Sequence, residues 1–455
     1  MKLKNLFNLL KVLPLFLLII SCGGPNESDD PIIIPVAKVQ ATFNMSISPS
    51  DPNVMLFDNK TVGKGEFMSE WDFGQGNGFV EDLPGIEEIR FDTDGTFTVT
   101  LKVTNEAGFT EDSKTVVVNN GTGGICPNGN CTSNSSSALK DATTTFFVGN
   151  ITRASRINAG GKHTEVLKSD FSSITSEYEM KMNVMYPSQG NYDFSAADVI
   201  VNFGFDNAIN VHGHALIWHN ATPDWVKDFA GSDSEFEAMV KDYITTTVTR
   251  YKGKIGSWDV VNEAIEDGSG NPLRNSIFKQ KMGDDYIKKC FQWARDADPD
   301  VLLFYNDYNM ASSPGKRAAM FKIVDSLGDL IDGVGAQMHI NYNFPSKSNI
   351  QAVADGTVSR GLKLHFAELD IRANPDNDQT SLTDERADEQ KAKFKEVVQI
   401  YNSIPLDNKY ALTVWGLRDN ETWLIDFWGH VDWPLMYDDN FNKKKAYNGF
   451  LEGLQ

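Results

Sequence analysis

The sequence has 455 residues, 41% of them hydrophobic and 23% charged, which is a globular composition and enough chain for two or three domains. The formal net charge of −20 argues against a protein that binds nucleic acid along its phosphates, because such binding needs a basic surface. An acidic surface keeps a protein in solution and fits a neutral substrate better than an anionic one.

The N-terminus has the features of a bacterial export signal. Lysines surround an apolar run over residues 12–20, which is too short to be a comfortable membrane span. The run leads into Ile19-Ile-Ser-Cys22, which resembles a lipobox, whose cysteine is lipidated after cleavage. We therefore expect a lipoprotein signal peptide over residues 1–21. A polar, acidic tether over residues 22–35 would follow it, similar to the export signal of surface lipoproteins.

Lipidation at Cys22 would anchor the chain in a bacterial outer membrane and expose it at the cell surface. The alternative is an ordinary secretory signal in which the cysteine stands by chance. Beyond this region, no apolar run in the sequence is long enough to cross a bilayer.

Residues 36–119 have an all-β pattern of short alternating runs, such as residues 96–103, broken by glycine and aspartate turns. Two segments, residues 70–76 (Glu-Trp-Asp-Phe-Gly-Gln-Gly) and residues 95–105, resemble the PKD domain, a small immunoglobulin-like sandwich of secreted bacterial enzymes. Two roles stay open, a passive spacer or a module that binds glycan or protein. Trp71 could offer a sugar platform, but in this motif we expect it in the core.

Residues 120–142 are rich in asparagine, glycine and serine and are predicted to be a linker. Cys126 and Cys131 flank a Pro-Asn-Gly-Asn turn, so a small disulfide loop is plausible in an oxidising compartment. A metal site would need further ligands nearby in the sequence, and none are present. Cys290 lies in an apolar helical pattern and is expected to be a buried free thiol.

From residue 143 to residue 455, short β-type runs alternate with longer amphipathic helical stretches, for example Asp233–Tyr251 and Arg386–Tyr401. Such alternation over this length predicts an α/β fold, a (β/α)8 TIM barrel, whose active site lies at the C-terminal ends of the strands. The eight strand candidates are Thr145–Val148, Ser173–Glu177, Asn210–Ile217, Ser257–Val261, Leu302–Tyr305, Gly333–Gln337, Leu364–Leu369 and Ala411–Trp415.

Two glutamates stand where apolar runs end. Glu263 closes the fourth run, and Glu368 closes the seventh. A carboxylate in such a position is costly unless it is paired or has a function. Retaining glycosidases need two carboxyl groups about 5–5.5 Å apart, one to protonate the leaving oxygen and one to attack the anomeric carbon. Structural ion pairs are the alternative, but strands four and seven face each other across a barrel.

Six motifs in order make residues 143–455 resemble glycoside hydrolase family 10, the (β/α)8 xylanases. They are His212-Gly-His-Ala-Leu-Ile-Trp-His219, Trp258-Asp-Val-Val-Asn-Glu263, Asn306-Asp-Tyr-Asn309, Gly335-Ala-Gln-Met-His339, Ala367-Glu-Leu-Asp370 and Val414-Trp-Gly-Leu-Arg-Asp-Asn-Glu-Thr-Trp423. The resemblance implies an endo-1,4-β-xylanase that acts by a retaining mechanism on xylan or xylooligosaccharides.

The resemblance also implies roles for particular residues. Glu263 would be the acid/base and Glu368 the nucleophile, with His339 bonded to Glu368 and Asp370 orienting the imidazole. Asn262 would bond the 2-hydroxyl of the sugar in subsite −1. Further substrate-binding residues would be Glu177, Lys181, His214, Trp218, Gln337, Trp415 and Trp423. No metal or cofactor is required, and we expect a monomer.

The sequence departs from the family's usual pattern around subsite −2. Tyr178 stands where the family commonly has an asparagine that binds the −2 sugar, Met182 replaces a tryptophan, and Ala221 replaces a glutamine. We hypothesise that Tyr178, with Ala221 opening the space opposite, reshapes this subsite. Two rival functions follow: a related β-glycanase acting on cellooligosaccharides or aryl-β-glycosides, and a non-catalytic xylan-binding surface protein.

Overall fold

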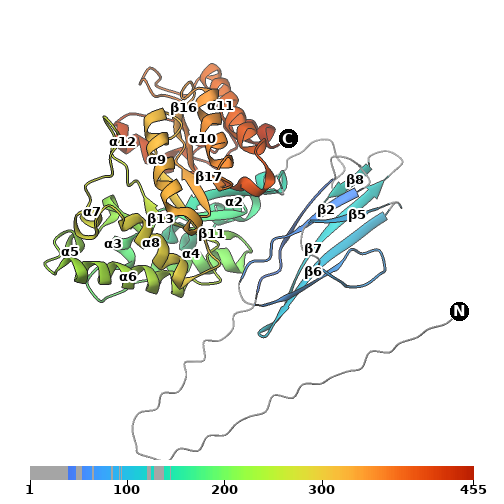
Figure 1. The fold of residues 1–455 in the computed structure, drawn as a ribbon. Coiled ribbons are helices and arrows are strands. Elements are labelled where there is room, and N and C mark those ends of the chain that lie inside the picture. The colour runs from blue at the N-terminus through green and yellow to red at the C-terminus, as the bar shows by residue number, and fades with distance from the viewer. Residues whose placement is uncertain are drawn as a thin grey trace, which may run out of the picture. The chain divides into compact units, whose positions relative to one another are not determined.

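A computed structural model gives the fold (Figure 1), and it describes residues 39–47, 54–63, 66–82, 86–91, 93, 95–119, 124–127, 138–143 and 145–455. The predicted signal peptide and tether, including Cys22, lie outside the described residues, as does Cys131 of the predicted disulfide loop. Within the described ranges, no helix is both long and apolar enough to cross a membrane.

The N-terminal body is made of antiparallel strands, as predicted. One sheet has the order β1-β2-β5 and the other β4-β3-β6-β7-β8. The strands are β1 Phe43–Ile47, β2 Val54–Asn59, β3 Met68–Asp72, β4 Val80–Glu81, β5 Ile86–Arg90, β6 Gly95–Asn105, β7 Gly108–Asn119 and β8 Gly124–Pro127. Trp71 is fully buried, its ring meets Phe43 edge-on at 4.8 Å, and its Nε1 donates to Asp82 Oδ1 at 2.7 Å. The expectation that Trp71 belongs to the core is therefore confirmed.

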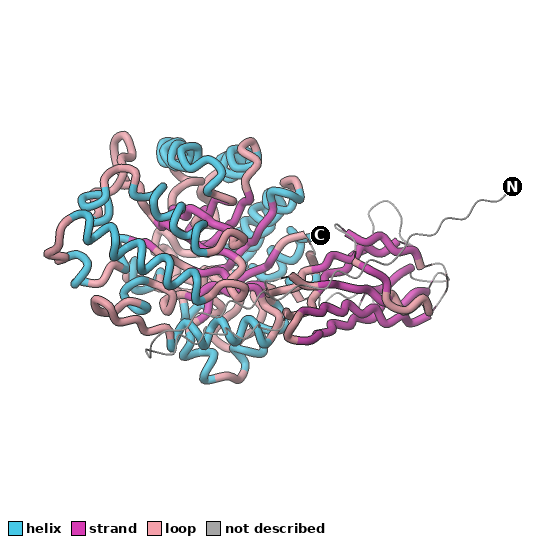
Figure 2. The backbone as a smooth tube through the Cα atoms, turned by 60° about the horizontal axis from the view of Figure 1, so that its bottom comes forward, coloured by secondary structure: helices cyan, strands magenta, loops and turns pink. Residues whose placement is uncertain are grey.

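The C-terminal body is a closed parallel barrel, which Figure 2 shows as strands surrounded by helices. Its ring runs β9-β10-β11-β13-β14-β15-β17-β18, and β18 pairs with β9 to close it. These strands are β9 Phe147–Thr152, β10 Ser173–Ser176, β11 Asn210–Gly213, β13 Ser257–Asn262, β14 Leu302–Asp307, β15 Gly333–Ala336, β17 Lys363–Arg372 and β18 Lys409–Val414. Two short strands at the mouth, β12 Ile217–Trp218 and β16 His339–Asn341, pair with β13 and β17.

Helices form the outer layer and bury apolar faces against the strands. They are α1 Ala154–Ala159, α2 Lys162–Asp170, α3 Met182–Met185, α4 Ser195–Asp206, α5 Asp224–Lys227, α6 Asp233–Arg250, α7 Ile277–Met282, α8 Tyr286–Ala297, α9 Pro314–Leu327, α10 Lys347–Val358, α11 Asp384–Asn402, α12 Leu424–Trp428 and α13 Lys445–Leu454, with 3-10 turns at Leu139–Asp141, His219–Ala221, Gly328–Leu330, Leu406–Asn408 and Asp419–Glu421. Helix α6 begins with a capping box between Ser232 and Glu235, as its sequence indicates. Cys290 on α8 is buried and free, as predicted.

All eight predicted barrel strands exist, with shifts at some ends. The first was predicted over Thr145–Val148, whereas β9 runs over Phe147–Thr152 and continues through Gly149. A Cβ at Gly149 would lie 2.4 Å from Thr413 Oγ1, so the glycine allows β9 to approach β18 closely. The third candidate divides into β11 and β12, because the chain bends at the mouth. The predicted domain boundaries stay predictions.

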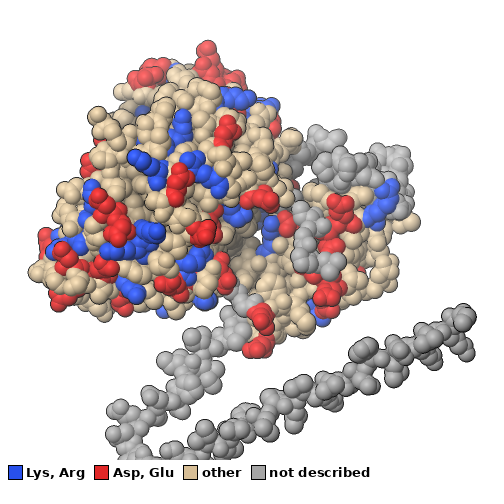
Figure 3. Space-filling view, viewed as in Figure 1, with Lys and Arg blue, Asp and Glu red and all other residues tan. Residues whose placement is uncertain are grey.

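The surface carries both signs of charge despite the net charge of −20. On the face in Figure 3, lysines and arginines are interspersed with aspartates and glutamates. This distribution agrees with the expectation that the net charge serves solubility more than the recognition of a charged polymer.

Candidate active site

Glu263 and Glu368 both lie at the C-terminal edge of the barrel, where a (β/α)8 fold carries its chemistry. Glu263 directly follows β13 and has a φ of 55°, a left-handed conformation that is rare outside glycine. Its N–H donates to Asn306 O at 2.9 Å and holds that conformation. Glu368 lies where the register between β17 and β18 shifts. Irregular backbone at both carboxyl groups is typical of a functional site.

The carboxyl group of Glu368 is buried and held by two donors. Asn306 Nδ2 donates to Oε1 at 2.7 Å, and His339 Nε2 lies 3.2 Å from Oε2. Burial would raise the pKa of Glu368, but the hydrogen bond from His339, the charge of His214 and the bond from Asn306 hold the pKa below its usual value. Glu368 is therefore an anion at neutral pH, as a nucleophile must be.

His339 connects Glu368 to a second buried carboxylate. Its Nδ1 lies 2.8 Å from Asp370 Oδ2, which also accepts a bond from Trp423 Nε1 at 3.1 Å. Burial would lower the pKa of His339, but Asp370 and Glu368 raise it to about 10. The imidazole is thus a cation that can donate both ring protons, one to each carboxylate.

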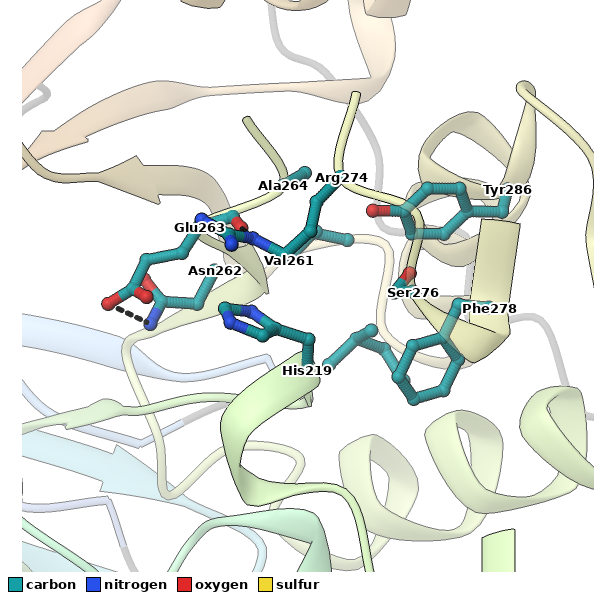
Figure 4. Close-up of a pocket in the computed structure, with 10 residues that line it drawn as sticks. His219, Val261, Asn262, Glu263, Ala264, Arg274, Ser276, Phe278 and Tyr286 are labelled. Atoms are coloured by element: carbon teal, nitrogen blue, oxygen red, sulfur yellow. Dashed lines mark hydrogen bonds between the residues drawn. The ribbon is translucent and has the colours of Figure 1, made fainter. Parts of the chain in front are cut away.

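Glu263 faces a different environment, formed by amides. Gln337 Nε2 donates to Glu263 Oε1 at 3.1 Å and to Asn262 Oδ1 at 3.2 Å, and Asn262 Nδ2 lies 3.4 Å from the same Glu263 oxygen. Figure 4 shows the Glu263 and Asn262 side chains together, with His219 and Arg274 beside them. Two carboxyl groups in such unlike surroundings can take unlike roles.

Two further residues line the site, Lys181 and His214. His214 Nδ1 lies 2.8 Å from Asp259 Oδ2, a buried contact that fixes the ring. Lys181 is buried beneath the rings of Trp218 and Tyr178, with its Nζ 4.6 Å and 4.8 Å from their centroids. Burial holds the pKa of Lys181 below its usual value, although the negative charges of Glu368, Glu177 and Glu263 oppose this shift.

Aromatic side chains form the walls of the site. The ring of His214 lies 6.3 Å from Trp218 and 5.4 Å from Trp415, and Trp423 packs against His339 at 4.9 Å. The structure therefore brings the predicted tryptophans together around the carboxyl groups, where a pyranose face could pack. His212 lies deeper and is buried: its Nδ1 bonds Ser257 Oγ at 2.6 Å and its Nε2 lies 3.0 Å from Asp259 Oδ2, so it belongs to the barrel interior.

Glu177 is held at the edge of the site by two arginines. Arg153 donates to both carboxylate oxygens of Glu177. Its Nε bonds Oε2 at 2.7 Å, and its Nη2 bonds Oε1. Arg156 adds an ion pair at 3.5 Å. The bidentate fork uses one lone pair of each oxygen and leaves the other as an acceptor, so the substrate-binding role of Glu177 stays a prediction. Within the described ranges, no group of three or more histidine, cysteine or acidic side chains is arranged to hold a metal ion.

The sequence predicted no role for three residues of the site, Asn306, Asp259 and Arg274, although the first two stand in motifs of the family. Asn306 bonds Glu368, Asp259 orients His214, and Arg274 Nε donates to Glu263 O at 3.2 Å. Asn306 could have been found by the rule that located the glutamates, because it is a polar residue near the end of a strand. The other two have no comparable signal.

A closed parallel barrel with two such glutamates at its mouth defines a (β/α)8 glycoside hydrolase. The model of the glycosyl hydrolase family 10 matches residues 138–453. The chain is 33% identical to the endo-beta-1,4-xylanase Xyn10C of Cellvibrio japonicus, over 94% of this chain and 75% of that protein. It is 38% identical to a beta-1,4-xylanase of Dictyoglomus thermophilum, over 63% of this chain and 82% of the relative.

Solved structures give the same result. The xylanase XynB of Paenibacillus barcinonensis, crystallised with a conduramine derivative, superposes with a TM-score of 0.65 at 32% identity, over 70% of this chain and all of that one. The chain belongs to glycosyl hydrolase family 10.

Proposed function

We propose that the chain is an endo-1,4-β-xylanase that hydrolyses internal β-1,4 bonds of xylan and retains the anomeric configuration. Its family and its relatives support the substrate, and the environments of Glu263 and Glu368 support the mechanism. The single observation that carries most weight is the chain of contacts from Asp370 through His339 to Glu368, which keeps Glu368 ionised.

In the first step, a carboxylate oxygen of Glu368 attacks the anomeric carbon and forms an ester bond to the sugar. The glycosidic C–O bond breaks, and its electron pair passes to the leaving oxygen. That oxygen takes a proton from the carboxyl group of Glu263. In this proposal Asn262, which lies beside Glu263, bonds the sugar's 2-hydroxyl, an interaction that strengthens as positive charge develops on the ring.

In the second step, a water molecule replaces the departed sugar. Glu263, now a carboxylate, takes a proton from that water, and the oxygen attacks the anomeric carbon. The ester bond to Glu368 breaks and its electron pair returns to the carboxylate. Two inversions give net retention, and both glutamates regain their initial states.

The test follows the products of xylohexaose by NMR in the first minutes of the reaction. Retention predicts that the β-anomer of the new reducing end appears first, and endo action predicts products of intermediate length. Initial α-anomer would overturn the double displacement. Binding of the polymer without any cleavage would favour the non-catalytic rival, and faster cleavage of cellohexaose would favour a related β-glycanase.

We also propose that Cys22 is lipidated and that the barrel is carried outside the cell on the tether over residues 22–35. The lipobox-like sequence and the short apolar run before it support this proposal. The N-terminal sandwich serves as a PKD-like spacer in this arrangement. The burial of Trp71 supports the spacer role, since the residue that could have offered a sugar platform is in the core. We propose a monomer.

A further inference from the structure

Helix α12 exposes two neighbouring aromatic rings at the mouth of the barrel. Phe427 is 64% exposed and Trp428 is 52% exposed, and their ring centroids lie 5.1 Å apart at an angle of 80°. Exposed apolar residues that stand singly need no explanation, but adjoining aromatic rings at a site mouth usually have a partner. We call Phe427 and Trp428 the α12 aromatic pair.

The α12 aromatic pair is continuous with the catalytic centre. Phe427 meets the ring of Trp423 at 5.0 Å, and Trp423 packs on His339 at 4.9 Å while its Nε1 bonds Asp370. A row of rings therefore runs from the histidine that bonds Glu368 to the exposed surface.

The pair is also held in place. Trp428 lies over the guanidinium of Arg372, 4.5 Å from its ring centroid. Arg372 is buried, pairs with Asp432 at 3.0 Å and donates to His430 at 2.9 Å. Asp432 in turn accepts the backbone N–H of Asn374 at 3.0 Å. Trp428 thus lies on a fixed ion pair, so its ring position costs little further ordering on binding.

We propose that the α12 aromatic pair binds a xylose residue of the polysaccharide backbone outside the −1 subsite, and this inference rests on the proposed xylanase function. The faces and edges of the two rings offer C–H and apolar contacts of the kind that a neutral pyranose makes. The nearest cation, Arg372, is already neutralised by Asp432, so the surface has no charge to recognise an acidic group.

The size of the surface argues against a protein partner. Aromatic side chains bury about 150–250 Å² each, so two half-exposed rings fall far short of the roughly 800 Å² per partner of a stable protein interface. One sugar ring is a better match to this area. Continuity with Trp423 places that sugar on the same chain as the sugar in the catalytic centre.

The test compares Phe427→Ala, Trp428→Ala and the double variant with the full chain, on unbranched polymeric xylan and on xylotriose. The quantity measured is the ratio of kcat/KM on the polymer to kcat/KM on the trisaccharide. We expect this ratio to fall about five- to tenfold in the double variant, in line with the worth of aromatic contacts. Leu406→Ala, a 47% exposed residue just before β18 at the opposite end of the barrel, should leave the ratio unchanged.

Several outcomes would overturn the inference. One is an unchanged ratio in both single variants. Another is a loss seen on arabinoxylan alone, which would assign the pair to a side group. A change of mass in sedimentation with an unchanged ratio would assign it to contact between two copies. Replacing Trp428 could disturb Arg372, which lies against its ring. In that case the single variant Phe427→Ala, which leaves Trp428 in place, still tests the inference. Wild-type protein without any xylanase activity would instead overturn the proposed function.

Discussion

The Nε2 atom of His339 lies 3.2 Å from the Oε2 atom of Glu368. His339 is the residue that does most to keep this buried carboxyl group ionised. The contact depends on Asp370, which lies 2.8 Å from the other ring nitrogen and stabilises the imidazolium. The imidazolium of His339 lies between the carboxylates of Glu368 and Asp370, so the three side chains together carry one net negative charge. The nucleophile therefore keeps its charge although its carboxyl group is buried.

Replacing His339 by glutamine should move the acid limb of the pH profile. The hydrogen bond and charge of His339 lower the pKa of Glu368, so their loss raises that pKa. Since attack needs the ionised form, the acid limb of kcat/KM should move to higher pH, and activity at pH 5 should fall relative to activity at pH 7. His430→Gln, which removes a histidine that bonds Arg372, should leave the limb in place. An unmoved limb in His339→Gln would contradict the assigned role.

Glu368→Ala should abolish nearly all hydrolysis, because no glycosyl ester can form. Sodium azide should restore turnover of an activated aryl xyloside, since the small anion fits the space that the carboxylate leaves. The product should be the α-azide, identified by NMR. A β-azide, or full activity without azide, would show that Glu368 is not the nucleophile.

The loss of activity in Glu263→Ala should depend on the leaving group of the substrate. Hydrolysis of xylan should fall about 10²–10⁴-fold, the range expected for general acid/base catalysis. Formation of the glycosyl-enzyme from a substrate with a good leaving group should survive, because that group departs without a proton. Stopped-flow measurement of the released phenol checks this. If the first step slowed equally on both substrates, the assignment of Glu263 as the acid/base would be wrong.

The sequence predicted the barrel and its two glutamates because both depend on local patterns. Buried parallel strands have apolar runs, and the end of each run marks the edge where chemistry gathers. Glu263 and Glu368 were found in this way, whereas the role of His339 came from the resemblance to the family. The pattern could not show that a glycine belongs inside β9, since the reason is Thr413, more than 260 residues away in the chain.

Subsite −2 shows the limit of motif reasoning most clearly. Glu177 matches the family's motif, and Arg153, directly after β9, donates to both of its oxygens. That contact joins the ends of β9 and β10 and depends on the pairing of these two strands, which the motif does not show. Ala221 is buried, and the hypothesis that it opens space opposite Tyr178 stays a prediction.

Cys22→Ser should release the protein from the membrane fraction, because the apolar run of the signal is too short to anchor the chain and stable attachment needs acyl chains. The measurement is the distribution of xylanase activity between washed membranes and the soluble fraction. Cys126→Ser is the matched control and should stay with the membranes. A Cys22→Ser protein that is processed and still membrane-bound would contradict the lipoprotein proposal.

Tyr178 is the residue that we expect to weaken subsite −2. It is 53% exposed, and its ring lies over two cations, with Arg153 at 5.5 Å and Lys181 at 4.8 Å from the centroid. A ring in this position replaces the asparagine that commonly bonds the −2 sugar in the family. The subsite therefore lacks the polar contact that the asparagine would make. Short linear substrates should therefore be cleaved slowly, since binding at −2 helps to orient the −1 ring.

Tyr178→Asn should raise kcat/KM on xylotriose about two- to twelvefold, which corresponds to one hydrogen bond worth roughly 0.5–1.5 kcal/mol. The gain should shrink from xylotriose to xylohexaose, because longer chains already bind at other subsites. Tyr178→Phe is the control: it keeps the ring and removes only the hydroxyl, so it should not gain activity. Ala221 is left unchanged, because a glutamine at that buried position would overpack its surroundings. If the wild type already cleaves xylotriose as well as xylohexaose, and Tyr178→Asn is no better, then Tyr178 does not impair the subsite and the proposal is wrong.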